Sequence, residues 1–419
     1  MPVLSKIAGD AQCSDFMHPW CDSCLKTFLI LWKIGFRESV KVYATFYGLS
    51  SLISRKTINY YFSKFPADIL RSSLFLSLNG ALFSIFICLI RLFQKFNILS
   101  IAYIPSFLAS GVALTFERKS RRQQLAVYMV NIALQTIYLM LKSRGYVSAI
   151  KNGEVLLFSA AAAGILFLFT AKKTPAYLSK FLGFLFGYSE IKDNCEKSVD
   201  QNQIQSNKIV YIKLKLSSVI NKICSIFHGK LHLPYKSIAC QHDFSCVQYI
   251  LSGFYKPFVV GILIEFGINL IKNIKSPLRF SKSLRKLKTY NLAMFIGSFS
   301  VVFRAMQCLQ RKLFTCRYQP IFAVVSGFIA GLTNRLYPSV SISMYAITKL
   351  AELCFRSCCS DIVSENFNTP FIIFLYSIST AIVFNAAILE PENVPKAYVK
   401  FLGKMTQNRI NGVNRAFLS

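Results

Sequence analysis

Acidic residues are scarce in this sequence of 419 residues: 18 Asp and Glu stand against 49 Lys and Arg, which gives a formal net charge of +31. Charged residues of both signs make up only 16% of the chain, whereas hydrophobic residues make up 53%. Soluble domains carry about 25% charged residues, so this composition excludes an ordinary soluble fold and predicts a membrane protein. The cations lie between apolar runs rather than on one polar domain. They therefore predict contact with anionic membrane lipids and argue against nucleic acid as a partner.

Motifs for several catalytic chemistries are also missing. The chain has only four histidines, too few for the iron sites of membrane desaturases, although His228 and His232 have a helical spacing. His18 and Asp22 are one residue too close for the acyltransferase pattern, and the sequence has no Gly-rich phosphate loop that ends in Lys-Ser/Thr. We therefore expect a protein that is not an enzyme and has no cofactor.

Charge-free apolar runs recur along the chain, and most approach the roughly 20 residues that a helix needs to cross a bilayer. They lack the alternation of strands, and backbone groups in lipid must be satisfied within one segment, which favours helices. Four runs lie in the first half and four shorter or less regular ones in the second: Ser72–Ile90, Phe96–Phe116, Gln123–Leu141, Val155–Ala171, Thr289–Phe303, Tyr318–Asn334, Leu336–Thr348 and Asn366–Leu389.

An amphipathic segment precedes each set of four runs. Leu25–Ile53 is apolar but carries several charges three or four residues apart, and Pro257–Ile271 is interrupted by Glu265. Helices of this kind lie on a membrane or on a helix bundle rather than cross the bilayer.

The two halves of the chain resemble each other. Ala176–Gly183 closes the first half and Ala397–Gly403 closes the second with nearly the same residues. At one constant offset, polar and small residues of the first half also fall on similar residues of the second, which indicates an internal repeat. The matched positions are Ser110, Ala113, Arg118 and Tyr128 against Gly327, Ala330, Arg335 and Tyr345.

These patterns predict an all-α membrane protein with two tandem, parallel four-helix transmembrane modules, each preceded by an amphipathic helix. The parallel orientation follows from the cations, which are richer on the same side of both copies. The predicted divisions are a Cys/His-containing segment 1–24, a first repeat 25–187, a polar linker 188–244, a second repeat 245–405 and a basic tail 406–419.

Small residues predict close helix packing in both copies. Gly327 and Gly331 form a GxxxG pattern, which lets a neighbouring backbone approach one face of a helix. Ser110 and Ala113 lie in the corresponding part of the first copy. The pattern leaves open whether the partner helix belongs to the same chain or to a second copy in a homo-oligomer.

Several sequence segments resemble the transmembrane protein 135 family. They run through almost the whole chain and are His18-Pro19 with Cys21 and Cys24, Glu117–Arg122, Asn152–Phe158, Ile342–Tyr345 and Tyr376–Ala381. The family is similar to a fusion of two modules of the four-span kind found in translocase subunits of the mitochondrial inner membrane. The resemblance implies a multi-pass protein of peroxisomes or mitochondria that acts in mitochondrial fission and in the handling of fatty acids and sterols. It implies organelle-dynamics proteins as partners, and no catalytic residue.

Cys and His cluster ahead of the first apolar segment. Cys13, His18, Cys21 and Cys24 have ligand types that bind zinc, and a looser second set lies ahead of the second repeat. The second set consists of Cys224, His228, His232, Cys240, His242 and Cys246. One CxxC pair is a weak signal, so free thiols packed beside a helix remain the alternative.

A basic turn separates two predicted spans. Arg118, Lys119, Arg121 and Arg122 lie within six residues, and Glu117 is the sole acidic residue there. Such a turn lies at headgroup level, where it fixes topology or binds a phosphate-bearing lipid. Arg335 occupies the corresponding place in the second copy.

Two functions are consistent with these observations. The first is a non-enzymatic protein that organises or passes lipids in organelle membranes. The second is a channel or carrier for a small anionic or acyl metabolite, suggested by the repeats and the excess of cations. A continuous polar cavity would favour the second function.

Overall fold

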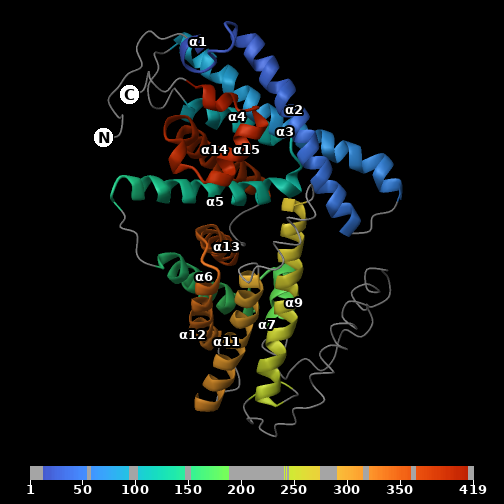
Figure 1. The fold of residues 1–419 in the computed structure, drawn as a ribbon, viewed down its shortest axis with the longest axis vertical. Helices are drawn as coiled ribbons and strands as arrows, with labels where there is room; N and C mark the ends of the chain where they lie inside the picture. Colours follow the sequence, from blue (N-terminus) through green and yellow to red (C-terminus); the bar gives the residue numbers. More distant parts are fainter. Residues whose placement is uncertain are drawn as a thin grey trace. The chain divides into compact units, whose positions relative to one another are not determined.

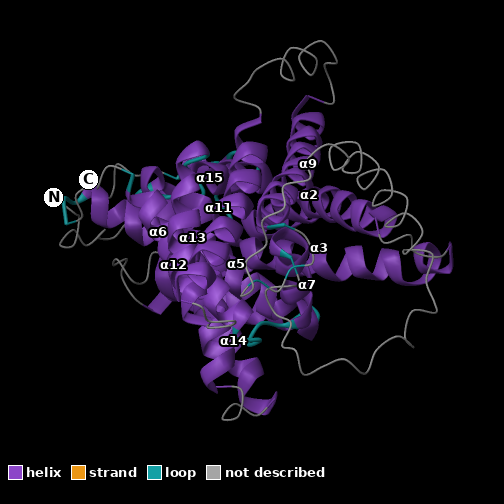
Figure 2. Ribbon diagram, turned by 90° about the horizontal axis from the view of Figure 1, so that it is seen from below, coloured by secondary structure: helices purple, strands orange, loops and turns teal. Residues whose placement is uncertain are grey.

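The computed structural model describes most of the chain, and every regular element in the described residues is helical (Figure 2). The described residues are 13–53, 58–93, 102–146, 152–187, 240, 242, 245–273, 290–314, 320–359 and 365–413. The predicted all-α class is confirmed for these residues. Of the predicted linker 188–244, only Cys240 and His242 lie within them.

The chain divides into two compact units that do not coincide with the predicted repeats. Unit 1 contains residues 1–149 and 361–419, and unit 2 contains residues 150–360. Each predicted repeat therefore places its last span in the unit of the other repeat. In Figure 1 the red C-terminal helices accordingly lie among blue and cyan helices, and green helices lie among orange ones.

The described part of unit 1 contains six α-helices, a short N-terminal turn and two 3₁₀ turns. Its elements are α1 (Cys13–Phe16), α2 (Cys24–Ile53), α3 (Ile58–Phe93), α4 (Ile104–Thr115), α5 (Lys119–Ser143), α14 (Glu365–Leu389), η5 (Pro391–Asn393), α15 (Lys396–Met405) and η6 (Arg409–Gly412). Helix α3 packs on α2 and α4, while α14 packs on α4 and α5, and α15 packs on α2. A continuous apolar core joins the two parts of the chain, with Ala113 of α4 and Val383 of α14 fully buried in it.

Unit 2 repeats this order of neighbours with its own helices. Its elements are α6 (Gly153–Thr170), α7 (Ala176–Phe186), α9 (Cys246–Asn273), α11 (Asn291–Phe314), α12 (Pro320–Gly331), η4 (Leu332–Leu336) and α13 (Val340–Cys359). Helix α11 packs on α9 and α12, while α6 packs on α12 and α13, and α7 packs on α9. The exchanged helices α6 and α7 thus have the same neighbours in unit 2 as α14 and α15 have in unit 1.

Polar side chains tie the unit 2 helices together by completing the hydrogen bonds of helix ends. Glu265 of α9 accepts a hydrogen bond from the backbone N–H of Leu292, in the first turn of α11, at 2.8 Å. Buried Arg304 donates to the carbonyl of Leu185 near the end of α7 at 3.2 Å, and Ser300 donates to the same carbonyl. First-turn N–H groups and last-turn carbonyls have no partner inside their own helix, so these contacts satisfy groups that apolar surroundings would otherwise penalise.

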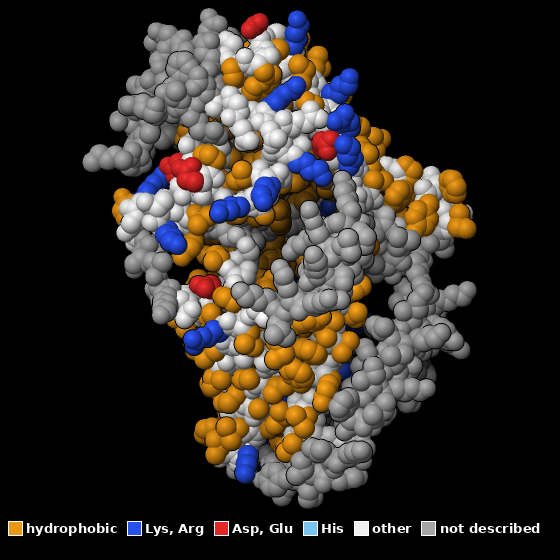
Figure 3. All heavy atoms as spheres, viewed as in Figure 1, with side chains coloured by type: hydrophobic (Ala, Val, Ile, Leu, Met, Phe, Trp, Pro, Cys, Tyr) orange, Lys and Arg blue, Asp and Glu red, His pale blue; other side chains and the backbone are white. Residues whose placement is uncertain are grey.

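Six described helices are long and apolar enough to cross a membrane: Ile58–Arg91, Lys119–Ser143, Gly153–Thr170, Cys246–Asn269, Asn291–Phe314 and Thr369–Leu389. Large hydrophobic side chains such as Phe62, Leu263 and Phe374 are exposed along them, and orange hydrophobic atoms cover much of the surface in Figure 3. A soluble protein rarely exposes so much apolar surface. The chain is a multi-pass membrane protein.

The predicted spans are correct at five of eight places. The run predicted at Phe96–Phe116 yields only the 12-residue α4 in the described residues, and the run at Tyr318–Asn334 yields the 12-residue α12 followed by η4. Helix α13 replaces the run at Leu336–Thr348, but Lys349, Glu352 and Arg356 make it too charged to qualify as a span.

Helix α9 departs from prediction in the opposite direction. We expected Pro257–Ile271 to be amphipathic, but α9 is longer, and its segment Cys246–Asn269 qualifies as a span. The carboxylate of Glu265 accepts a hydrogen bond from the first turn of α11. This part of α9 therefore does not need to face water. Helix α2, by contrast, is not among the candidate spans, as expected from its charges.

Candidate functional site

Unit 1 contains a cavity of about 520 Å³, within the roughly 300–1,000 Å³ that is typical of ligand pockets. Helices α2, α3, α5, α14 and α15 line it together with η6 and the segment between α1 and α2. Most of its wall is carbon, from side chains such as Phe75, Phe83, Phe384 and Leu402. An apolar wall of this kind favours an apolar ligand over a hydrophilic one.

Three hydrogen-bond donors in the cavity wall are buried and have no partner among the described residues. They are Nε1 of Trp20, Oγ1 of Thr27 and Nη1 of Arg409. Trp20 packs beside the turn of η6, because a Cβ built on Gly412 would lie 3.4 Å from its ring. The wall around η6 therefore offers an indole N–H and a guanidinium to an acceptor, and a buried donor without an acceptor is costly.

Asn79 and Arg121 in the cavity wall already have partners for their donor groups. Asn79 donates to the hydroxyl of Tyr376 at 3.0 Å, and Arg121 lies over the ring of Tyr43 with its Cζ 5.4 Å from the centroid. Burial raises the pKa of Tyr43 to about 12, so its hydroxyl stays protonated at neutral pH. These groups shape the wall without adding a free charge.

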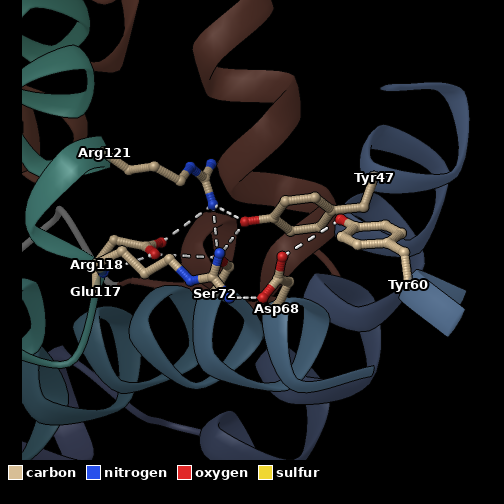
Figure 4. A network of polar contacts seen from close by, with 7 residues as sticks. All are labelled: Tyr47, Tyr60, Asp68, Ser72, Glu117, Arg118 and Arg121. Carbon is tan, nitrogen blue, oxygen red and sulfur yellow. Dashed lines mark hydrogen bonds and ion pairs between the residues drawn. The ribbon is translucent and has the colours of Figure 1, made fainter. Parts of the chain in front are cut away.

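The predicted basic turn joins α4 to α5, where two of its arginines are bound to buried carboxylates (Figure 4). Arg118 forms an ion pair with Asp68 of α3, and Arg121 lies 3.4 Å from Oε2 of Glu117. Ser72 lies between them, since it donates to Glu117 at 3.2 Å and accepts from Arg121 at 2.6 Å. Arg118 and Arg121 therefore belong to a neutral cluster of two acids and two arginines.

The remaining cations of the predicted headgroup set have different surroundings. Arg122 donates to the carbonyls of Glu117 and of Thr115, the last residue of α4. Lys119 is exposed at the start of α5, and Arg335 is exposed in η4 of unit 2. Of this set, Lys119 and Arg335 remain available to lipid headgroups. The other three cations, Arg118, Arg121 and Arg122, stabilise the turn between α4 and α5.

Sequence reasoning missed Asp68. Glu117 is the only acidic residue within the turn, so the sequence around the turn gives no sign of a second acid. Asp68 comes from another helix, is 4% exposed, and also accepts from the hydroxyl of Tyr60 at 3.3 Å. An acid amid aromatic residues at the start of a long apolar helix was the available signal, since such a group needs a cationic partner.

The two glycines predicted to pack helices do face the backbone of a neighbouring helix. A Cβ on Gly331 would lie 2.4 Å from Cα of Ser159, and one on Gly327 would lie 2.9 Å from Cα of Ala163. Both contacts are with α6 of the same unit. In unit 1, Ser110 and Ala113 of α4 are fully buried.

Three of the four predicted N-terminal metal-ligand candidates come together, and a fourth group joins them from α3. The Sγ atoms of Cys13, Cys24 and Cys88 lie within 4.8 Å of one another. Nε2 of His18 is 3.7 Å from Sγ of Cys88. Cys21 does not take part, since its thiol points to the carbonyl of Ser23.

A second group of the same composition lies in unit 2. Ligand atoms of Cys240, His242, Cys246 and Cys308 lie within 4.8 Å of one another, and all four residues are buried. The Cys308 thiol, through a hydrogen bond, lowers the pKa of Cys240 and so favours its thiolate. Cys224, His228 and His232, from the looser predicted set, lie outside the described residues.

Residues 10–141 match the family model described as the N-terminal cysteine-rich region of Transmembrane protein 135. These residues are similar to the N-terminal region of the transmembrane protein 135 family, which confirms the predicted resemblance over this part of the chain. No solved structure matches the chain.

The match to the transmembrane protein 135 family covers the part of unit 1 that contributes most of the candidate site. It includes α1 to α4 and most of α5, hence Cys13, Cys24, Cys88 and the cluster around Glu117. Arg409 and the helices α14 and α15 come from the other end of the chain. The cavity is complete only when this C-terminal segment packs on the family's N-terminal region.

Proposed function

We propose that the protein binds one amphipathic lipid, a fatty acid or a sterol, in the unit 1 cavity. In this proposal it is a non-enzymatic protein of peroxisomal or mitochondrial membranes that acts in lipid handling and mitochondrial dynamics. The observation that carries it is the apolar cavity with the unpartnered donors of Trp20, Thr27 and Arg409 in its wall.

The chemistry of the wall fits such a ligand in two respects. Burial of a hydrocarbon chain or ring system against carbon contributes about 25 cal/mol per Å² removed from water. A carboxylate or hydroxyl at one end would accept hydrogen bonds from Trp20 and Arg409, and a charge-assisted bond to Arg409 would be the stronger one. A hydrophilic metabolite would gain little from contact with this apolar wall. The wall therefore supports lipid binding over a channel or carrier for small anions.

The organelle and the link to fission rest on the family alone. The exposed cations Lys119 and Arg335 favour anionic lipids as further partners, and organelle-dynamics proteins or a second copy of the chain are proposed as protein partners. Fractionation of peroxisomes from mitochondria with a tagged chain tests the location. Recovery of the chain in neither organelle would contradict it.

Filling the cavity tests the lipid proposal directly. Gly80 lines the cavity, and a Cβ added there meets no atom within 4 Å, so Gly80→Phe places a ring in open space. We expect this variant to bind a labelled fatty acid or sterol at least tenfold more weakly in detergent. Gly48→Phe is the matched control, because Gly48 is equally unobstructed but does not line the cavity.

A second test concerns the contact between Arg409 and the polar end of the bound lipid. Arg409→Gln keeps a donor but removes the charge, so it should weaken a fatty acid more than a sterol, because only the carboxylate gains from charge. Equal affinity of wild type, Gly80→Phe and Gly48→Phe for both lipids would overturn the proposal. Weak lipid binding by both Gly80→Phe and Gly48→Phe would also overturn the proposal.

A further inference from the structure

Two Cys₃His groups recur at equivalent places in the two units. In each, one cysteine is the first residue of the leading helix, Cys24 of α2 or Cys246 of α9. A second cysteine lies on the following long helix, Cys88 of α3 or Cys308 of α11. The remaining cysteine and the histidine precede the leading helix. The same four ligand types therefore meet twice, although the intervening sequences differ.

We infer that each group is a closed, structural zinc site, so that the chain holds two zinc ions. The first site has the ligands Cys13, His18, Cys24 and Cys88, and the second has the ligands Cys240, His242, Cys246 and Cys308.

The spacing of the ligand atoms fits a single tetrahedral ion. Zinc lies about 2.3 Å from sulfur and about 2.0 Å from nitrogen, which places neighbouring ligand atoms roughly 3.5–3.8 Å apart. Sγ of Cys240 and Sγ of Cys246 are 3.8 Å apart, and Nε2 of His242 is 3.6 Å from Sγ of Cys308. In unit 1, Nε2 of His18 is 3.7 Å from Sγ of Cys88.

The surroundings of His18 orient it as a ligand. Its Nδ1 lies 2.6 Å from the carbonyl oxygen of Cys21, a contact in which only Nδ1 can carry the proton. The lone pair of Nε2 then faces the thiol of Cys88, 3.7 Å away. Zinc-binding histidines are commonly held by such a second hydrogen bond to a backbone carbonyl. Cys21, the predicted ligand that is not used, thus contributes through its backbone.

A compensating charge accompanies both groups. Zinc with three thiolates and a neutral histidine carries a net charge of −1. Arg91 lies three residues after Cys88 on α3, and Arg311 lies three residues after Cys308 on α11, so each arginine is one helical turn away. An anionic metal centre in apolar surroundings needs a cation of this kind.

Disulfides and iron–sulfur clusters fit the groups less well. Three thiols and one imidazole cannot all pair in disulfides, so oxidation would leave one buried cysteine and the histidine without a role. An iron–sulfur cluster distributes its ligands over several irons and so cannot hold all of them within 4.8 Å of one another. The three thiols of the first group and all four ligand atoms of the second group do lie within that distance. A single ion uses all four groups.

Each site would fix the segment ahead of its leading helix to the next long helix. In unit 1 this segment carries Trp20, which lines the cavity. Four closed ligands leave no position for substrate, so the expected role is folding stability rather than catalysis.

Metal content measured on the purified full-length chain tests the inference. Wild type prepared without chelators should contain about two zinc ions per chain by elemental analysis. Cys88→Ser and Cys308→Ser should each retain about one, and the double variant none. Cys21→Ser and Cys354→Ser are matched controls that should retain two, because neither thiol belongs to a group.

A second measurement uses only wild type and therefore does not depend on the folding of variants. Replacement of zinc by cobalt should give the intense visible bands of a tetrahedral site and the ultraviolet charge transfer of thiolate ligands. Metal-free wild type with all six thiols of the two groups open to alkylation would overturn the inference. So would a disulfide within either group after thiol blocking at lysis, or iron with labile sulfide. None of these results depends on lipid binding.

Discussion

Asn79 of α3 donates a hydrogen bond from Nδ2 to the hydroxyl of Tyr376 of α14 at 3.0 Å, although the two residues are 297 positions apart. Both side chains are buried and both line the cavity. Near them, Phe83 and Phe384 pack edge to face with ring centroids 5.2 Å apart. The last span of the chain and the short helices after it are thus an integral part of a unit whose other helices come from the start of the chain.

The Asn79–Tyr376 bond should give a measurable coupling free energy. Tyr376→Phe leaves the buried Asn79 amide without an acceptor and should lower the free energy of unfolding by about 1–3 kcal/mol. In the double variant Asn79→Leu/Tyr376→Phe, part of that loss should return, with a coupling of about 0.5–3 kcal/mol. Unfolding in detergent measures all four corners of the cycle. Asn79→Leu combined with Tyr128→Phe is the control and should be additive.

Exchange of the last spans predicts that the two halves stay together when the linker is cut. A specific protease site placed between Gln201 and Asn207 separates α1–α7 from α9–α15. Both fragments should co-elute in mild detergent, because each supplies helices to both units. Two repeats that fold independently would instead elute as separate fragments, and that outcome would contradict the exchange.

The helical class and most spans were predictable because long apolar runs without charge allow few other structures. The lengths of α4 and α12 were not predictable, because an apolar run does not indicate how many of its residues are helical. The exchange of the last spans between the two units could not be predicted from the sequence either. Similarity between Ala176–Gly183 and Ala397–Gly403 identifies equivalent elements, but it does not say on which unit each element packs.

The candidate sites show the same limit. Cys13, His18 and Cys24 could be proposed from their types, but Cys88 is a lone thiol within an apolar run and far along the chain. Comparison of the two copies held the missing signal, because Cys88 and Cys308 are each followed three residues later by arginine. Arg409 had no such signal, since only folding brings the C-terminal tail to the cavity.

The parallel orientation of the two repeats remains a prediction from the distribution of cations. Tags at Met1, between Gln201 and Asn207, and at Ser419 should all be cleaved by protease on the same side of the membrane. A linker tag that is protected while both terminal tags are cleaved would contradict the prediction.

Close packing of α12 on α6 should make Gly331 sensitive to one methyl group. Gly331→Ala places a Cβ 2.4 Å from Cα of Ser159, and backbone cannot yield as a flexible side chain does. Overpacking of this kind costs about 1–3 kcal/mol, which a lower midpoint of thermal unfolding in detergent would reveal. Gly267→Ala, in the same unit with no atom within 4 Å of the new Cβ, should leave the midpoint unchanged or raise it slightly. Equal midpoints for the two variants would contradict the contact.

The cluster at the start of α5 should respond far more strongly to loss of charge than a partly exposed ion pair does. The Glu117 side chain is fully buried, and Arg121 is 19% exposed, so Glu117→Gln leaves an arginine without its carboxylate in apolar surroundings. Breaking a buried pair from one side costs about 3–5 kcal/mol, because the desolvation of the remaining charge is no longer offset.

The Arg144–Glu390 pair of the same unit provides the comparison. Its atoms are 2.7 Å apart, but the two side chains are 35% and 25% exposed. Arg144→Gln should therefore cost only about 0–1 kcal/mol, since water and salt screen an accessible pair. Unfolding of both variants at low and high salt separates the two cases: the loss in Arg144→Gln should shrink with salt, whereas the loss in Glu117→Gln should persist. Similar small losses in both variants would mean that Glu117 is not the counter-charge of Arg121.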